Sequence, residues 1–123
     1  MLELLKILSQ KDNLVFVGNV AMMLQGIQVT PTDVDIVVTD LEGLKGYTEY
    51  TTDSKFSVSG KRAFILGEYH IDIFIEERLP QYVITSGLKV ETLYYMEKYY
   101  KRIYPLVDHR WKIRIDEKLE LLK

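Results

Sequence analysis

The sequence contains no cysteine, and this absence excludes disulfide bonds and zinc sites built from cysteine ligands. No apolar run approaches the roughly 18 to 20 residues that a membrane-spanning helix needs. The first residues also lack the basic segment followed by a long apolar segment that marks a signal peptide. The net charge of -2 excludes a surface that is basic overall, as a general polyanion binder would have. We therefore expect a cytoplasmic protein that does not enter the membrane.

The residues that are present are typical of one folded domain. The chain has 123 residues, and 47% of them are hydrophobic, which is enough for a substantial core. We therefore treat residues 1–123 as a single domain. The charge is uneven, because residues 1–88 carry 7 basic and 12 acidic side chains, whereas residues 89–123 carry 9 and 6. An acidic half facing a basic half would suit a metal–polyphosphate substrate, but ordinary solvated helix faces would give the same pattern.

A strand, a turn and a short helix follow one another near the N-terminus. The apolar run Leu14–Val17 predicts a short buried strand, and Gly18 predicts a turn directly after it. Asn19 belongs to a residue type that caps helices well, so we expect it to cap a helix at Val20–Leu24 that Gly26 ends. A glycine turn before a helix presents N–H groups and a positive dipole end, which favours phosphate. Gly18 and Asn19 are therefore candidate phosphate-binding residues.

Two acids occupy alternate positions on the next expected strand, Asp33–Val38. Because side chains at i and i+2 of a strand point to the same face, Asp33 and Asp35 converge. Two like charges beside a core are unfavourable, and a hard divalent cation such as Mg2+ would relieve that cost. The alternative is a strand end that carries two solvated acids. The pair alone leaves both interpretations open.

A third acid lies inside an apolar strand further along the chain. We expect strands at Lys55–Ser59, Arg62–Leu66 and Tyr69–Ile75, joined by tight turns into an antiparallel arrangement. Asp72 lies between isoleucines in the last of these strands. Buried carboxylates are almost always paired, hydrogen-bonded or bound to metal. Asp72 is therefore a candidate third ligand, and the alternative is an acid that faces water on an edge strand.

The remaining segments predict one N-terminal helix, one further strand and two C-terminal helices. Leucines at helical spacing predict a helix within residues 1–10 that packs on the sheet. Tyr82–Thr85 predicts a short strand, and Tyr47–Ser54 predicts a polar segment along the surface. Val90–Tyr104 and Asp108–Leu122 predict the two C-terminal helices, which occupy residues 90–122 together.

This order of elements predicts an α/β (α+β) fold with a mixed sheet and helices packed on it. The turn at Gly18 and Asn19, the pair Asp33 and Asp35, and the later Asp72 together resemble the nucleotidyltransferase superfamily with the DNA polymerase β-like fold. In that family's pattern, a Gly-Ser or Gly-Gly turn precedes a short helix, an Asp-x-Asp strand and a third Asp on a later strand. The match covers residues 14–75. The resemblance implies a small, single-domain nucleotidyltransferase-like protein.

The resemblance further implies a metal-dependent transfer of a nucleoside monophosphate from an NTP, for instance ATP, to an unidentified acceptor. Asp33 and Asp35 would hold two Mg2+ ions, and Asp72 would share the second ion and help to deprotonate the acceptor. Gly18 and Asn19 would bind phosphate. The sequence departs from the family pattern at position 19, where the family has a serine that contacts phosphate. We therefore expect Asn19→Ser to raise nucleotide affinity if the site binds nucleotide.

Two other functions remain open from the sequence. The chain could be a catalytically inactive nucleotidyltransferase-like domain that binds nucleotide or a protein partner, as in a toxin–antitoxin pair or an accessory role. Its small size favours this alternative, because it leaves little room for an acceptor-binding domain. It could also be a structural or dimerisation module. The tyrosine-rich C-terminal helices are the candidate surface for a homodimer or protein partner, although packing on the sheet would explain the same tyrosines.

Overall fold

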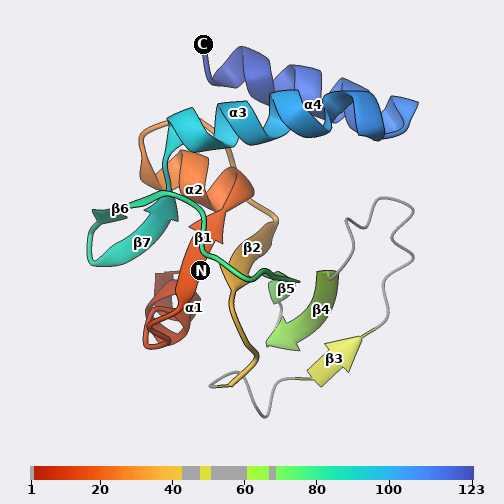
Figure 1. Ribbon diagram of the computed structural model, residues 1–123. Coiled ribbons are helices and arrows are strands. Elements are labelled where there is room, and N and C mark those ends of the chain that lie inside the picture. The colour runs from red at the N-terminus through yellow and green to blue at the C-terminus, as the bar shows by residue number, and fades with distance from the viewer. Residues whose placement is uncertain (1, 43–47, 51–60, 67–68) are drawn as a thin grey trace.

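The computed structural model describes residues 2–42, 48–50, 61–66 and 69–123, which form one mixed sheet with helices on both of its sides (Figure 1). In chain order the elements are α1 (Leu2–Leu8), β1 (Leu14–Val17), α2 (Gly18–Leu24), β2 (Asp33–Val38), β3 (Thr48–Tyr50), β4 (Lys61–Leu66), β5 (Tyr69–Ile75), β6 (Tyr82–Thr85), β7 (Leu88–Glu91), α3 (Leu93–Ile103), the 3-10 helix η1 (Tyr104–Leu106) and α4 (His109–Leu121). In the described part of the chain, no helix has the length and apolar character needed to cross a membrane.

Within the described residues, seven strands form the sheet in the order β3-β4-β5-β2-β1-β7-β6. β2 runs parallel to β5 and β1 runs parallel to β7, while the other neighbouring pairs are antiparallel. The predicted mixed sheet of an α/β (α+β) fold is therefore confirmed. The predicted strands at Leu14–Val17, Asp33–Val38 and Tyr82–Thr85 have the expected bounds.

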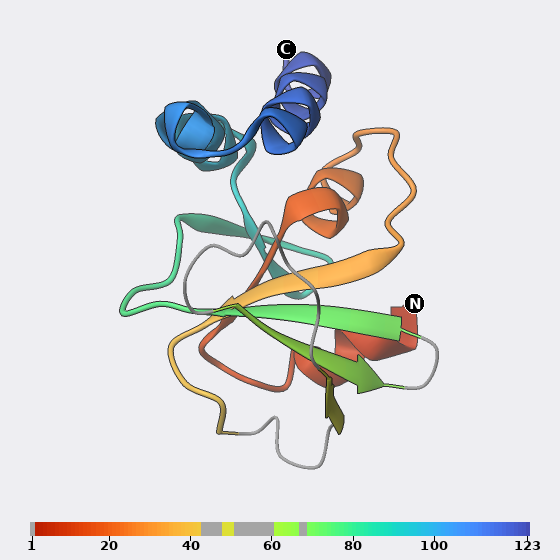
Figure 2. The same ribbon diagram turned by 90° about the vertical axis from the view of Figure 1, so that its right-hand side faces the viewer.

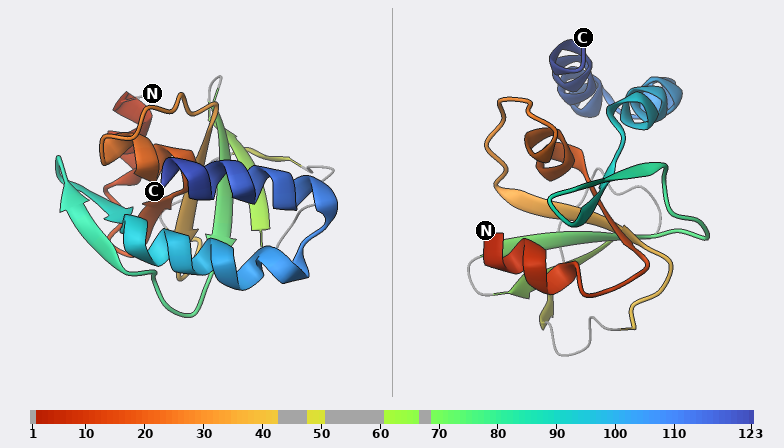
Figure 3. Two further views of the ribbon diagram at one scale, coloured as in Figure 1. Left: turned by 90° about the horizontal axis from the view of Figure 1, so that it is seen from above. Right: turned by 90° about the vertical axis from the view of Figure 1, so that its left-hand side faces the viewer.

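The helices α2, α3 and α4 lie on one side of the sheet, and α1 lies on the other (Figures 1 and 2). α3 and α4 run side by side in opposite directions over the sheet (Figure 3). The leucines at helical spacing in α1, Leu4, Leu5 and Leu8, are buried as their spacing predicts. They belong to one core cluster that also contains Phe16 of β1 and Ile115 of α4. The first and last helices therefore share a hydrophobic core with the central strands.

The first C-terminal helix is shorter than the predicted Val90–Tyr104, because a strand occupies its expected first turn. Ser86 and Gly87 adopt positive φ angles of 52° and 79°, so the chain reverses within two residues. Leu88–Glu91 then pairs with β6 as strand β7. Because Leu88 and Val90 alternate with polar residues, this segment fits the two-residue period of a strand, which the apolar helical pattern further on had obscured.

α3 begins only after Thr92, whose side-chain oxygen accepts a hydrogen bond from the Tyr95 backbone N–H at 3.1 Å. This is the N-cap geometry expected of threonine. The helix ends at Ile103, and Pro105 lies in the 3-10 helix η1 that follows. The predicted helix at Asp108–Leu122 is confirmed as α4, with Asp108 as its N-cap.

The short strand β3 was not predicted, because Tyr47–Ser54 was interpreted as a polar surface segment. β3 has three residues and pairs antiparallel with β4, at one edge of the sheet. An edge strand of three residues forms because its backbone makes hydrogen bonds to the neighbouring strand. Three residues are too few to show a clear hydrophobic period in the sequence. The predicted strand at Lys55–Ser59 lies outside the described residues.

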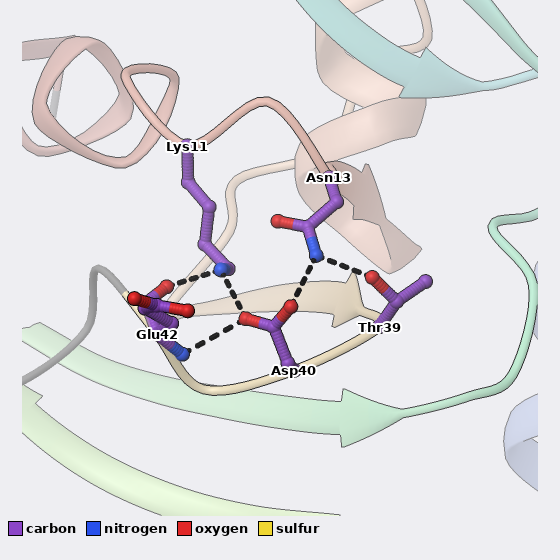
Figure 4. Close-up of polar contacts among 5 residues, drawn as sticks. All are labelled: Lys11, Asn13, Thr39, Asp40 and Glu42. Carbon is purple, nitrogen blue, oxygen red and sulfur yellow. Dashed lines mark hydrogen bonds and ion pairs between the residues drawn. The ribbon is translucent and has the colours of Figure 1, made fainter.

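A group of polar contacts closes the end of the β1–β2 pair that is remote from Asp35 (Figure 4). Lys11 lies 2.7 Å from a carboxylate oxygen of Asp40 and also donates to the backbone carbonyl of Glu42. Asn13 donates to the Thr39 hydroxyl and, at 3.0 Å, to Asp40. The hydrogen bond from Lys11 holds the pKa of Asp40 below its ordinary value. Asp40 is therefore an acid with a structural partner.

Candidate active site

Asp35 and Asp72 lie side by side on neighbouring parallel strands. The register pairs Asp35 of β2 with Asp72 of β5, and Asp33 with His70. Paired residues on neighbouring strands point to the same face, as do residues two apart on one strand, so all three acids share one face. A hydrogen bond joins the carboxyl groups of Asp35 and Asp72. The structure therefore forms a carboxylate pair and places the exposed Asp33 two residues away on the same face.

The environment of this pair favours the protonated form of Asp35. Its pKa is raised from 3.8 to about 7, first by burial, then by the charge of Asp72 and the hydrogen bond to it. The charge of Asp33 acts in the same direction, and the ammonium group of Lys118 acts against it. Below about pH 7 the carboxyl group of Asp35 therefore holds a proton when no cation is bound. A divalent cation between the two carboxylates would replace that proton.

Gly18 permits the close approach of the turn to Asp35. The antiparallel register pairs Val17 with Asp35, so the next residue, Gly18, comes against the acid. Gly18 has a φ of +65°, and a Cβ atom on it would lie 2.5 Å from Oδ2 of Asp35. Both the backbone conformation and the contact require glycine. The predicted turn residue is thus in contact with one of the predicted acids.

Asn19 does not cap α2, and this part of the prediction is wrong. The helix begins at Gly18, directly after β1, and its N-cap is Val17, which has no capping side chain. Asn19 is therefore the second helical residue. Its side-chain oxygen accepts a hydrogen bond from Nζ of Lys118 in α4, at 2.8 Å. Asn19 thus joins two elements that lie 99 residues apart in the chain.

Lys118 lies beside the candidate site, and the sequence analysis did not identify it. It lies seven residues after Trp111 and three after Ile115, so it shares the apolar face of α4. Burial lowers its pKa, although the charge of Asp35 acts against this. Its ammonium group also lies 5.7 Å from the ring centre of the buried Tyr100. A lysine on the apolar face of a helix is the signal that could have revealed it.

Glu91 is a second residue missed by the sequence analysis, which placed it in a helix. It follows Val90, whose partner on the parallel strand β1 is Phe16. Glu91 is therefore level with Val17 and points to the face that carries Asp35, the partner of Val17. The residue is only 6% exposed, and burial raises the pKa of its carboxyl to about 7. A buried acid thus lies two strands from Asp35 on the same face.

The carboxylate pair has the type of oxygen ligand that a magnesium ion prefers. Across the described ranges, no three His, Cys, Asp or Glu side chains form an arrangement that could hold a metal ion by themselves. Mg2+ does not require three, because it is commonly bound through one or two carboxylates with substrate phosphates and water as its other ligands. Asp35 and Asp72 supply two such carboxylates in contact. Binding of metal here remains a prediction.

Comparisons with known proteins identify the fold. No family model and no curated protein matches the chain. Among solved structures, the chain is similar to the crystal structure of a candidate nucleotidyltransferase from Thermotoga maritima, with a TM-score of 0.55 and 19% sequence identity. The similarity covers 85% of this chain and 82% of the other. The protein therefore has a nucleotidyltransferase-like fold.

Proposed function

We propose that the protein is a metal-dependent nucleotidyltransferase that transfers a nucleoside monophosphate from an NTP to an acceptor hydroxyl or a similar group. The observation that carries this proposal is the contact between Asp35 and Asp72, on adjacent parallel strands, beside the glycine turn at Gly18. The fold agrees with it, because a protein described as a candidate nucleotidyltransferase has a similar structure.

In this proposal the three acids bind the metal. Asp35 and Asp72 would hold the first Mg2+ ion between them, and Asp33, on the same face, would contribute to a second. Bound Mg2+ neutralises phosphate charge and stabilises the attacking and leaving oxygens of an in-line displacement. Asp35 must lose its proton on metal binding, so its raised pKa makes binding weaken as the pH falls below about 7.

The remaining roles belong to the chain's own side chains. Asp72 would accept the proton of the acceptor hydroxyl as the acceptor oxygen forms its bond to the α-phosphorus. The bond between the α-phosphorus and the oxygen bridging to the β-phosphate would break, and pyrophosphate would leave with the electron pair. Lys118, whose ammonium group interacts with Asp35, would offset part of the phosphate charge. Gly18 would keep the carboxyl of Asp35 free of steric hindrance.

Calorimetric titration with a non-hydrolysable NTP analogue, in the presence and absence of Mg2+, tests the binding part of this proposal without knowledge of the acceptor. We expect Mg2+-dependent binding by the wild type, and its loss in Asp35→Asn and Asp72→Asn. Asp40→Asn is the matched control, because Asp40 is an acid just beyond the end of β2 that is remote from Asp35, where it pairs with Lys11. Release of pyrophosphate from an NTP, with candidate acceptors added, then tests catalysis.

The outcomes separate the proposed function from its main alternative. Binding that needs Mg2+ and Asp35, followed by pyrophosphate release, supports a nucleotidyltransferase. Binding without pyrophosphate release for any acceptor would favour an inactive nucleotide-binding domain. An absence of binding at millimolar concentrations of every common NTP would contradict both.

A further inference from the structure

The hydrogen bond between Lys118 and Asn19 determines how the Asn19 amide is oriented. An ammonium group can only donate, so the atom that Lys118 contacts must be the amide oxygen of Asn19. The oxygen and nitrogen of a planar amide diverge from the same carbon, so the Nδ2 group points away from Lys118. No described residue accepts a hydrogen bond from this Nδ2 group. The two N–H donors of Asn19 therefore have no acceptor among the described residues, and the bond from Lys118 sets their direction.

The contacts of the Lys118 ammonium group are consistent with a role in orienting Asn19. The side chain is partly buried, and its ammonium group lies among the Asn19 oxygen, the ring of Tyr100 and the negative field of Asp35. Among the described residues, no carboxylate forms an ion pair with it. The hydrogen bond to the Asn19 oxygen therefore restrains the Lys118 ammonium group, and the same bond restrains the orientation of the Asn19 amide.

The same residues lie close to the candidate metal ligands. Gly18, the residue before Asn19, packs closely against the carboxylate of Asp35. The ammonium group of Lys118 interacts with the charge of the same carboxylate. A polyphosphate that shared a cation with Asp35 and Asp72 would therefore extend beside Asn19. Anions accept hydrogen bonds strongly from amide N–H groups, and a nearby ammonium group strengthens the attraction.

We propose that Lys118 is a positioning residue, which holds the Asn19 amide so that its Nδ2 group donates to a phosphate oxygen of the bound NTP. This inference rests on the proposed nucleotide-binding function. It makes α4 part of the nucleotide site, although the acids and the turn all belong to the sheet and α2. It also reverses the expectation for Asn19→Ser. Serine has a single hydroxyl on a shorter side chain, which cannot replace both the oxygen that accepts from Lys118 and the N–H groups that would reach phosphate, so the variant should bind nucleotide more weakly.

A double-mutant cycle on the full chain tests the proposal. The variants are Asn19→Ala, Lys118→Met and the double substitution, and the probe is a non-hydrolysable ATP analogue with Mg2+, measured by calorimetry. If Lys118 acts through Asn19, each single change weakens binding by about tenfold, and the double change weakens binding by clearly less than the product of the two single effects. Lys118→Arg, which can donate the same bond, should retain more affinity than Lys118→Met. Melting curves without nucleotide identify any variant that fails to fold.

Lys112→Met is the matched control on the same helix, because the ammonium group of Lys112 lies over the Tyr104 ring, at 5.6 Å, and does not contact Asn19. It should leave binding unchanged. Wild-type binding combined with fully additive effects of Asn19→Ala and Lys118→Met would overturn the positioning role alone. Affinity in Asn19→Ser equal to or above that of the wild type would do the same. No binding by the wild type would overturn both this inference and the proposed function.

Discussion

Gly18 and Asp35 are in a contact that only glycine permits. A Cβ atom at position 18 would lie 2.5 Å from Oδ2 of Asp35, and the φ of +65° disfavours any L side chain there. The turn and the acid come together because Val17 and Asp35 are register partners on antiparallel strands. The position of the acid therefore depends on the absence of a side chain in the turn.

We expect Gly18→Ala to lower the free energy of unfolding by about 2 kcal/mol or more and to abolish Mg2+-dependent nucleotide binding. The carboxyl of Asp35 would have to move away from the new methyl group. Urea unfolding and calorimetric titration measure the two effects. Gly26→Ala is the control, because Gly26 has a φ of +92° but a Cβ atom added to it would have no neighbour within 4 Å. It should share the backbone strain and keep the binding.

The stability of the metal-free protein should fall as the pH rises from about 4 to about 7. The pKa of Asp35 is raised from 3.8 to about 7 in the folded state, so in this window the folded protein binds more protons than the unfolded chain. Asp35→Asn removes that contribution and should reduce the fall between pH 5 and pH 8, measured by urea unfolding. At pH 8 the variant should be at least as stable as the wild type.

Glu91 should also make the free energy of unfolding fall as the pH rises toward 7, since burial raises the pKa of its carboxyl to about 7. Asp35→Asn should therefore flatten the pH profile only in part, and Glu91→Gln should flatten it further. A fall of equal size in the wild type and in Asp35→Asn would show that Asp35 ionises in the folded state as it does in the unfolded chain.

Mg2+ together with an NTP should raise the melting temperature, and neither should do so well alone. A ligand present at about 100 times its dissociation constant adds roughly 2.7 kcal/mol, which for a domain of this size corresponds to on the order of 10 °C. Asp35→Asn should remove this shift without lowering the melting temperature of the ligand-free protein. A shift that persists in Asp35→Asn would place the nucleotide elsewhere on the protein.

Lys11→Met should lower the melting temperature without changing nucleotide affinity. The Lys11 side chain is only 9% exposed and holds Asp40 and the backbone of Glu42 at the end of β2 remote from Asp35 (Figure 4). Its loss would leave acceptors without their donor. Thermal melting with and without Mg2+ and NTP separates the two effects. A large loss of affinity would mean that this end of the sheet also governs the site.

The acids of the candidate site could be found in the sequence because their pattern is local. Asp33 and Asp35 lie on one strand, so the two-residue period alone places them on one face. Asp72 stands out as an acid among isoleucines. The pairing of Asp35 with Asp72 could not be predicted from local pattern, because neither segment shows the parallel register of two strands that are distant in the chain. The resemblance to a known family supplied the expectation that they meet.

The residues that were missed depend on tertiary structure. Lys118 comes beside the candidate site because α4 folds back over the sheet beside α3 (Figure 3), and no local pattern shows where a helix docks. Glu91 was placed in a helix because the segment Leu88–Glu91 is short and adjoins a strong helical pattern. Asn19 was assigned as a cap from its residue type, but the helix starts at Gly18, two residues before the predicted Val20, and the Asn19 side chain accepts a hydrogen bond from Lys118.

The hydrogen bond from Lys118 to Asn19 also has a consequence for synthesis on the ribosome. The strands that carry the acids are translated long before α4, but domains generally fold as units, and Ile115 of α4 belongs to the same core as those strands. Until α4 has left the ribosome, a nascent chain therefore lacks both part of the core and the side chain that orients Asn19. If Lys118 acts as proposed, the ability to retain nucleotide arises only when the last helix has left the ribosome and docked, so unfinished chains would not sequester NTP.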